Sequence, residues 1–90
     1  MKKIDKSQAR EIAHEMCAHI GILIREERKR QDLTQEDLAE AAGISEKFLS
    51  SIENGREPNI SIGYLVAISS ALEIELSGWL AESEKRTDKR

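Results

Sequence analysis

Start and stop signals for short helices follow one another closely in the middle of the chain. Thr34, followed three residues later by Asp37, forms the pattern of a capping box at a helix start. Gly43 supplies the left-handed residue that commonly ends a helix, and Ser45 can cap the next helix. Asn54-Gly55 is a second stop signal. The sequence therefore predicts two short helices joined by a tight turn.

The remainder of the chain also has helical periodicity, and β-branched residues nowhere alternate at a period of two. An apolar stripe at spacings of three and four predicts a first helix over residues 7–31, with Gly21 on its far face. The stripe consists of Ala9, Ile12, Ala13, Met16, Ile20, Leu23 and Ile24. Arg28, Lys29 and Arg30 fall in the last turn, where the helix dipole favours cations.

Two more helices are expected after Pro58, the only proline. Ser61 can cap a fourth helix. Its expected core face is Ile62, Leu65, Ile68, Ala71 and Leu72. A short fifth helix around residues 77–81 turns Leu76, Trp79 and Leu80 inward. The polar residues 83–90 are expected to fray. The predicted fold class is all-α.

Length and composition exclude several classes of protein. Ninety residues suit one domain with a thin core. Cys17 is the only cysteine, which excludes an intrachain disulfide framework. No apolar run approaches the ~18 residues of a membrane span, and the basic N-terminus lacks the apolar stretch of a secretory signal. With three aromatic residues, a stacking platform for single-stranded nucleic acid is not expected.

The charge is distributed unevenly. The net charge is −3, which argues against a general binder of polyanions. Residues 1–31 hold eight Lys or Arg and five Asp or Glu, whereas residues 32–60 hold two and seven. Residues 83–90 hold four Lys or Arg and two Asp or Glu. Both ends are positive and the middle is negative.

The predicted helix pair is typical of one structural motif. A short turn containing glycine holds two helices at about 90–120°, so that the second can enter the DNA major groove. The stretch LTQEDLAEAAGISEKFLSSIENG, residues 33–55, closely resembles the phage-repressor and Cro-like (Xre-type) helix-turn-helix family. The likeness extends over residues 20–80. It implies a compact five-helix, lambda-repressor-like DNA-binding domain at 20–82, preceded by a helical extension (1–19) and followed by a polar tail (83–90).

The resemblance also implies roles for individual residues. Gln35 opens the second helix, where the family's glutamine touches a phosphate and braces the recognition helix. The N–H groups behind Thr34 offer a helix N-terminus to a phosphate as well. The third helix is the recognition helix, and Arg28 and Glu53 match positions that form a buried ion pair. The implied DNA-binding residues are Thr34, Gln35, Ser45, Glu46, Lys47, Phe48, Ser50, Ser51, Asn54 and Arg56.

Side-chain chemistry supports part of this assignment independently. Lys47 can reach guanine or a phosphate, Glu46 can accept from cytosine, and serines suit either type of base. However, the third helix lacks the Arg and Gln that usually make bidentate base contacts, and its net charge is −1. We therefore expect modest affinity per protomer and a need for dimerisation.

Alternative interpretations remain open for several residues. Phe48 either packs against the second helix or contacts a thymine methyl group. Ser50 and Ser51 either contact DNA or are small residues that permit close packing, and Lys47 can be an ordinary surface lysine. The extension 1–19 either covers the protomer's own core or forms a dimer seam. Trp79, Leu80 and Ile22 are candidates for an exposed apolar surface that a partner would cover.

The sequence does not favour a metal site or catalysis. His14 and Cys17 are neighbours on one helix, but His19 points elsewhere and a fourth ligand is lacking. No nucleophile lies beside a base, and no glycine-rich loop could cradle a phosphate. We expect no enzyme activity, no cofactor, no metal and no small-molecule ligand.

The predicted function is therefore transcriptional regulation by a cytoplasmic, bacterial or phage homodimer that binds a palindromic operator. Repression or autoregulation is expected, and restriction–modification controller proteins have this size and organisation. The alternative is an antitoxin-like module that binds a protein partner and only secondarily DNA.

Overall fold

The structure, a computed structural model, describes residues 1–87 of the chain. The described part contains helices and no strands. In chain order the helices are α1 (Lys6–Arg30), α2 (Gln35–Ala42), α3 (Glu46–Glu53), α4 (Ile62–Ala71) and α5 (Leu76–Arg86). The all-α prediction is confirmed.

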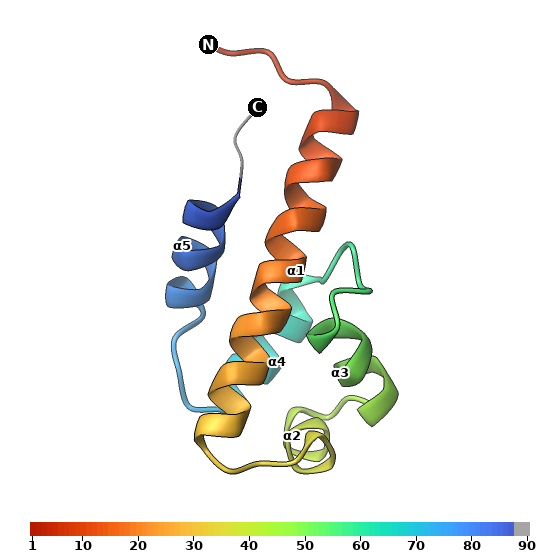
Figure 1. Cartoon of the computed structure of the whole chain (residues 1–90), viewed down its shortest axis with the longest axis vertical. Helices are drawn as coiled ribbons and strands as arrows, with labels where there is room; N and C mark the ends of the chain where they lie inside the picture. The colour runs from red at the N-terminus through yellow and green to blue at the C-terminus, as the bar shows by residue number, and fades with distance from the viewer. Residues whose placement is uncertain (88–90) are drawn as a thin grey trace.

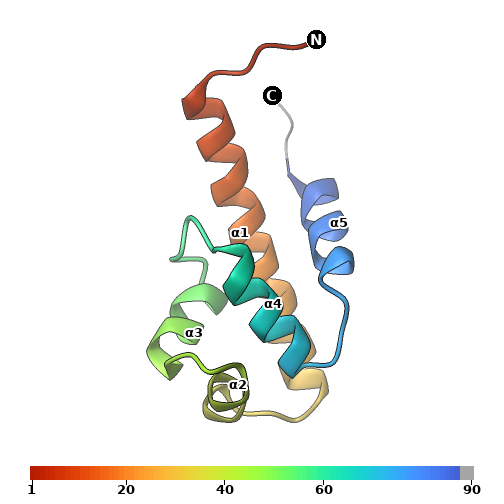
Figure 2. The same cartoon turned by 180° about the vertical axis from the view of Figure 1, so that it is seen from behind.

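α1 is the long axis around which the other helices are arranged. Its start is fixed by a capping box in which the Asp5 carboxylate accepts from the N–H of Gln8 at 2.8 Å. α5 packs alongside the N-terminal half of α1, whereas α2, α3 and α4 gather around its C-terminal half (Figures 1 and 2). α1 therefore runs without a break from the predicted extension into the domain, and α5 of the same protomer covers part of that extension.

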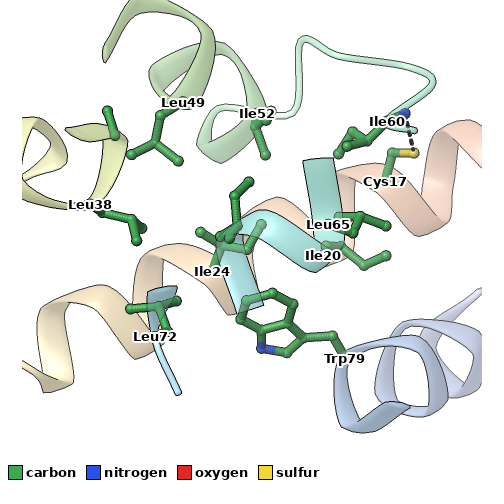
Figure 3. Packing of buried hydrophobic residues seen from close by; sticks show 12 residues of the cluster. Cys17, Ile20, Ile24, Leu38, Leu49, Ile52, Ile60, Leu65, Leu72 and Trp79 are labelled. Atoms are coloured by element: carbon green, nitrogen blue, oxygen red, sulfur yellow. Dashed lines mark hydrogen bonds between the residues drawn. The ribbon is translucent and has the colours of Figure 1, made fainter. Parts of the chain in front are cut away.

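The hydrophobic core lies where α1 meets the four shorter helices (Figure 3). Each helix region contributes side chains to it, among them Ile24 of α1, Leu38 of α2, Leu49 of α3, Leu72 directly after α4 and Trp79 of α5. The sequence alone left open whether Trp79 belongs to an exposed apolar surface. Trp79 is buried, so it does not. The other buried members are Cys17, Ile20, Ala39, Ile52, Ile60, Leu65 and Ile68.

Gly21 does not lie on an open face of α1 as predicted. It is buried, and a Cβ atom at this position would lie 2.1 Å from the backbone carbonyl oxygen of Ile52. Only glycine allows α1 and α3 to approach each other this closely. The prediction failed because α1 is covered on more than one side.

The core face of α4 also differs from the prediction. Leu65, Ile68 and Leu72 are buried as expected, but Ile62 is exposed. Ser69 takes a place in the core, where its hydroxyl donates to the Val66 carbonyl at 3.2 Å. This local hydrogen bond satisfies the hydroxyl and makes a serine compatible with burial.

The predicted tail does not fray over its first residues, because α5 continues to Arg86. Ser83 is fully buried, and its hydroxyl donates to the Leu80 carbonyl at 3.0 Å. The hydroxyl of Thr87, also buried, donates to the Ser83 carbonyl at 2.8 Å. Residues 88–90 of the predicted tail lie outside the described residues.

No single helix within residues 1–87 is long and apolar enough to cross a membrane. α4 and α5 meet that criterion only together, by length and composition, and the chain bends by 118° between them.

Candidate nucleic-acid interface

The start of α2 is fixed by the capping box that the sequence predicted. The Thr34 hydroxyl accepts from the N–H of Asp37 at 3.0 Å, and the Asp37 carboxylate accepts from the N–H of Thr34 at 2.9 Å. The backbone hydrogen bond from Thr34 lowers the pKa of Asp37. The box leaves the N–H groups of Gln35 and Glu36 in the first turn without an intrahelical acceptor. A phosphate could use them, although Glu36 and Asp37 place two carboxylates nearby.

Gly43 makes the turn between α2 and α3. Its φ of 71° and ψ of 32° are left-handed. The N–H of Ile44 bonds to the Ala39 carbonyl at 3.0 Å and that of Gly43 to the Glu40 carbonyl at 3.2 Å. These two bonds form a Schellman motif, which satisfies carbonyl groups at the end of α2. The turn thereby fixes the direction in which α3 leaves α2.

Gly43→Val should destabilise the domain by more than the roughly 1–2 kcal/mol of a left-handed L-residue, because valine is β-branched. A Cβ atom at Gly43 would meet nothing within 4 Å, so the cost comes from backbone conformation and not from a clash. Gly43→Asn is the matched control, since asparagine tolerates this conformation. Thermal unfolding of both variants checks the prediction, and an unchanged Tm for Gly43→Val would contradict the assigned turn.

α3 presents its N-terminal turn to solvent. The Ser45 hydroxyl caps the helix by accepting from the N–H of Phe48 at 3.0 Å. Ser45, Glu46 and Lys47 are all exposed, next to the corner made by Gly43. Leu49 and Ile52 on the opposite side of α3 are fully buried. α3 therefore has one face anchored in the core and one polar end free to meet a ligand.

The later predicted contact residues are less accessible. Ser50 and Ser51 are half-buried, whereas Asn54 is exposed. The Asn54 amide donates to the Ser50 hydroxyl at 3.2 Å. This bond links two predicted contact residues one turn apart.

A second Schellman motif ends α3. Gly55 has a φ of 72°, and the N–H of Arg56 donates to the Ser51 carbonyl at 2.9 Å. The Arg56 side chain is exposed directly after this turn. Lys47 precedes the buried residues of α3 and Arg56 follows them. One exposed cation therefore lies on each side of the part of α3 that is anchored in the core.

Phe48 has a partner that the sequence did not reveal. It is half-buried and meets Tyr64 of α4 edge to face, with ring centroids 4.8 Å apart and planes at 62°. The sequence considered only the second helix or a thymine methyl group. An aromatic residue in an otherwise small and aliphatic fourth helix was the available signal. The contact ties the recognition helix to α4.

Behind the exposed face lies the ion pair that the sequence predicted. Arg28 Nε donates to Glu53 Oε2 at 2.8 Å and Arg28 Nη2 to Glu53 Oε1 at 2.9 Å, with the side chains 9% and 1% exposed. The hydrogen bonds to Glu53 raise the pKa of Arg28. Arg28 Nη1 also donates to the Leu33 carbonyl at 2.8 Å. The bidentate geometry locks the end of α3 against α1.

Gln35 joins the same network, as expected from the family resemblance, in which this glutamine braces the recognition helix. Its half-buried side-chain amide donates to Glu53 Oε1 at 3.1 Å. Glu53 therefore binds the first residue of α2 and the last turn of α1 at once. The predicted phosphate-contacting amide is held in place from the protein side, with its second N–H group left for another acceptor.

The residues considered for a metal site take other roles. Cys17 is buried, and its Sγ accepts from the N–H of Ile60 at 3.4 Å (Figure 3). His14 is exposed and His19 half-buried. Within residues 1–87, no three His, Cys, Asp or Glu side chains gather closely enough to hold a metal ion.

Proteins of related sequence carry the same arrangement. A family model described as helix-turn-helix matches residues 24–79. SlrR, an HTH-type transcriptional regulator of Bacillus subtilis (strain 168), is 41% identical over 58 residues, which are 64% of this chain and 38% of SlrR. The chain thus spans about two fifths of that regulator's length.

Solved structures are similar as well. The restriction-modification controller protein C.AhdI from Aeromonas hydrophila is 28% identical, with a TM-score of 0.67 over 70% of this chain and 94% of that one. SinR, a master regulator for biofilm formation solved in complex with DNA, is 36% identical, with a TM-score of 0.65 over 68% and 97%. These relatives are transcription regulators and not enzymes. With a family match over more than half of its residues, the chain belongs to the Xre-like helix-turn-helix family.

Proposed function

We propose that the chain is a sequence-specific DNA-binding transcriptional regulator that acts as a cytoplasmic homodimer on a palindromic operator. Repression by covering promoter DNA is the expected mode, and no cofactor, metal or catalytic step takes part. The observation that carries the proposal is the exposed N-terminal turn of α3, held at a fixed angle by the Gly43 turn and the Arg28–Glu53 pair. The DNA complex of SinR, whose fold is similar, supports it.

The side chains of the proposed DNA-binding face divide into two roles. Lys47 and Glu46, in the first turn of α3, are suited to base edges in the major groove. Gln35 and Arg56 are suited to the phosphates that flank it. Ser45, Ser50, Ser51 and Asn54 complete the proposed face, with Thr34 at the start of α2. Phe48, half-buried against Tyr64, supports the face from behind and offers a ring edge to a thymine methyl group.

Lys47→Glu with Arg56→Glu tests this assignment. Each reversal removes a favourable contact and adds a repulsion, so operator affinity should fall by about a hundredfold or more. The slope of log affinity against log salt should flatten by about one, the contribution of the Arg56 phosphate contact. Fluorescence anisotropy measures both, with an operator selected from a pool of random duplexes.

A matched control carries the same change of charge elsewhere. Lys6→Glu with Arg10→Glu alters two exposed cations on the N-terminal half of α1, away from α2 and α3 (Figure 1). This variant should bind almost as the parent does, apart from a general electrostatic effect. Equal losses in both double variants, or unchanged binding in Lys47→Glu with Arg56→Glu, would reject the assigned face.

The antitoxin-like alternative rests on the exposed acidic surface of α2, which carries Glu36, Asp37 and Glu40. Such a surface suits a basic protein partner better than a phosphate backbone. On this alternative, charge reversal at Glu36 and Glu40 would release a protein partner, while Lys47→Glu would leave that complex intact.

A further inference from the structure

The described residues leave one helix face uncovered that is apolar and carries no charge. Ile62, Tyr64 and Val66 of α4 are 61%, 45% and 47% exposed. They are half of the large hydrophobic residues that the structure exposes, and they fall within a helix of ten residues. In Figure 2, α4 lies on the near side of the molecule with no other helix in front of it.

The composition of this face is unusual for the chain. Residues 61–72 include no Asp, Glu, Lys, Arg or His, although 34% of the whole chain is charged. Between the large side chains, Gly63 and Ser70 are exposed and Ala67 is half-buried. These small residues form a shallow strip along which another helix can approach closely. An uncharged, uncovered helix in a charged protein marks an interaction surface.

We propose that a second copy of this chain covers the exposed face of α4, with the two α4 helices antiparallel across a two-fold axis. This inference rests on the proposed function, which requires a homodimer, and it names the surface that forms it. A two-fold axis places each residue against the same surface of the copy. A face without charge can meet itself without repulsion between like charges, which the acidic exposed face of α2 cannot.

The charges at the two ends of α4 favour the antiparallel pairing. Exposed Glu73 and Glu75 follow its C-terminus, while the N-terminus capped by Ser61 is the positive end of the helix dipole. In an antiparallel pair the acidic end of each helix lies beside the positive end of the other. A parallel pair would bring the acidic ends together.

The same face is continuous with the recognition helix. Tyr64 packs edge to face on Phe48 of α3, so the proposed dimer surface and the DNA-reading helix share an aromatic contact. Ser45, Glu46 and Lys47 stay outside that contact and remain exposed. Dimerisation through α4 would therefore fix the separation of two α3 helices without covering their base-reading ends.

Val66→Glu tests the proposal, with Ile22→Glu as its matched control. Ile22 is 44% exposed on α1, which lies on the opposite side of the molecule from α4 (Figures 1 and 2). Sedimentation equilibrium over a dilution series should give the parent and Ile22→Glu at twice the 10.2 kDa mass of the chain. Val66→Glu should shift the equilibrium toward the monomer by about a hundredfold or more, because two carboxylates would face each other. Circular dichroism checks that each variant is folded.

A cross-linking experiment keeps the proposal testable if Val66→Glu does not fold. Val66→Cys should form a disulfide with its own copy on mild oxidation, whereas Ile22→Cys and the parent, whose Cys17 is buried, should not. A parent that is monomeric without DNA, a dimer unaffected by Val66→Glu, or cross-linking only through Ile22→Cys would overturn the proposal. So would a co-purified foreign protein released by Val66→Glu.

DNA binding separates this inference from the proposed function. Val66→Glu should retain weak binding to a half-site while it loses tight binding to the full operator. Operator binding by a parent that dimerises through another surface would reject the α4 interface and leave DNA binding intact. Dimerisation through α4 with no binding to any duplex would support the α4 interface and reject the proposed DNA-binding function.

Discussion

Replacing Glu53 by leucine should lower the free energy of unfolding by about 3–5 kcal/mol, because it leaves the Arg28 guanidinium buried without its counter-charge. The side chains of Arg28 and Glu53 are only 9% and 1% exposed, so water cannot take the place of the carboxylate. The Gln35 amide loses its partner as well. Urea denaturation measures the change against a total stability that is typically about 5–15 kcal/mol.

Two further variants show whether burial causes this loss. Arg28→Met combined with Glu53→Leu should recover much of it, since removing both charges avoids the uncompensated one. Glu82→Ala breaks a pair in which Arg86 and Glu82 are 41% and 43% exposed, and should cost less than about 1 kcal/mol. A small effect of Glu53→Leu, similar to that of Glu82→Ala, would show that the pair does not lock α3 against α1.

Gly21→Ala should destabilise the domain by about 1–3 kcal/mol or more, although alanine is the better helix former. The added Cβ atom would lie 2.1 Å from the Ile52 carbonyl oxygen, which is backbone and cannot rotate away. α1 and α3 would have to separate, and the buried pair between them would be strained. Thermal and urea unfolding of the variant measure the loss.

Gly78→Ala is the matched control for this variant. Gly78 lies in α5, is exposed, and would place a Cβ atom in open space. The same substitution there should stabilise the domain by up to about 1 kcal/mol, through helix propensity alone. If both variants gained stability, α1 and α3 could not be as close as the structure has them.

Features that depend on local sequence were predictable. Thr34, Ser45 and Ser61 each cap the expected helix, and Gly43 has the expected left-handed conformation. The Arg28–Glu53 pair followed from the family resemblance and is present. Caps and turns are determined by a few neighbouring residues, which explains why the helix starts and the turn could be placed from sequence alone.

Features that depend on tertiary packing were not predictable. Gly21 is buried because α3 crosses α1 at that point, and no spacing in the sequence records a crossing point. Ser69 and Ser83 are buried with their hydroxyls bonded to nearby carbonyl groups, whereas a hydrophobicity pattern counts them as polar. The Phe48–Tyr64 contact likewise joins separate helices. The roles of the exposed residues in DNA binding stay predictions.

The most direct test of DNA recognition is the binding of the purified chain to two labelled duplexes at several salt concentrations. One duplex comes from upstream of the protein's own gene, and the other is its scrambled counterpart. Fluorescence anisotropy should show tighter binding to the upstream duplex, with log affinity falling linearly as log salt rises. Equally weak binding to both, with no sequence enriched from a random pool of duplexes, would contradict sequence-specific regulation.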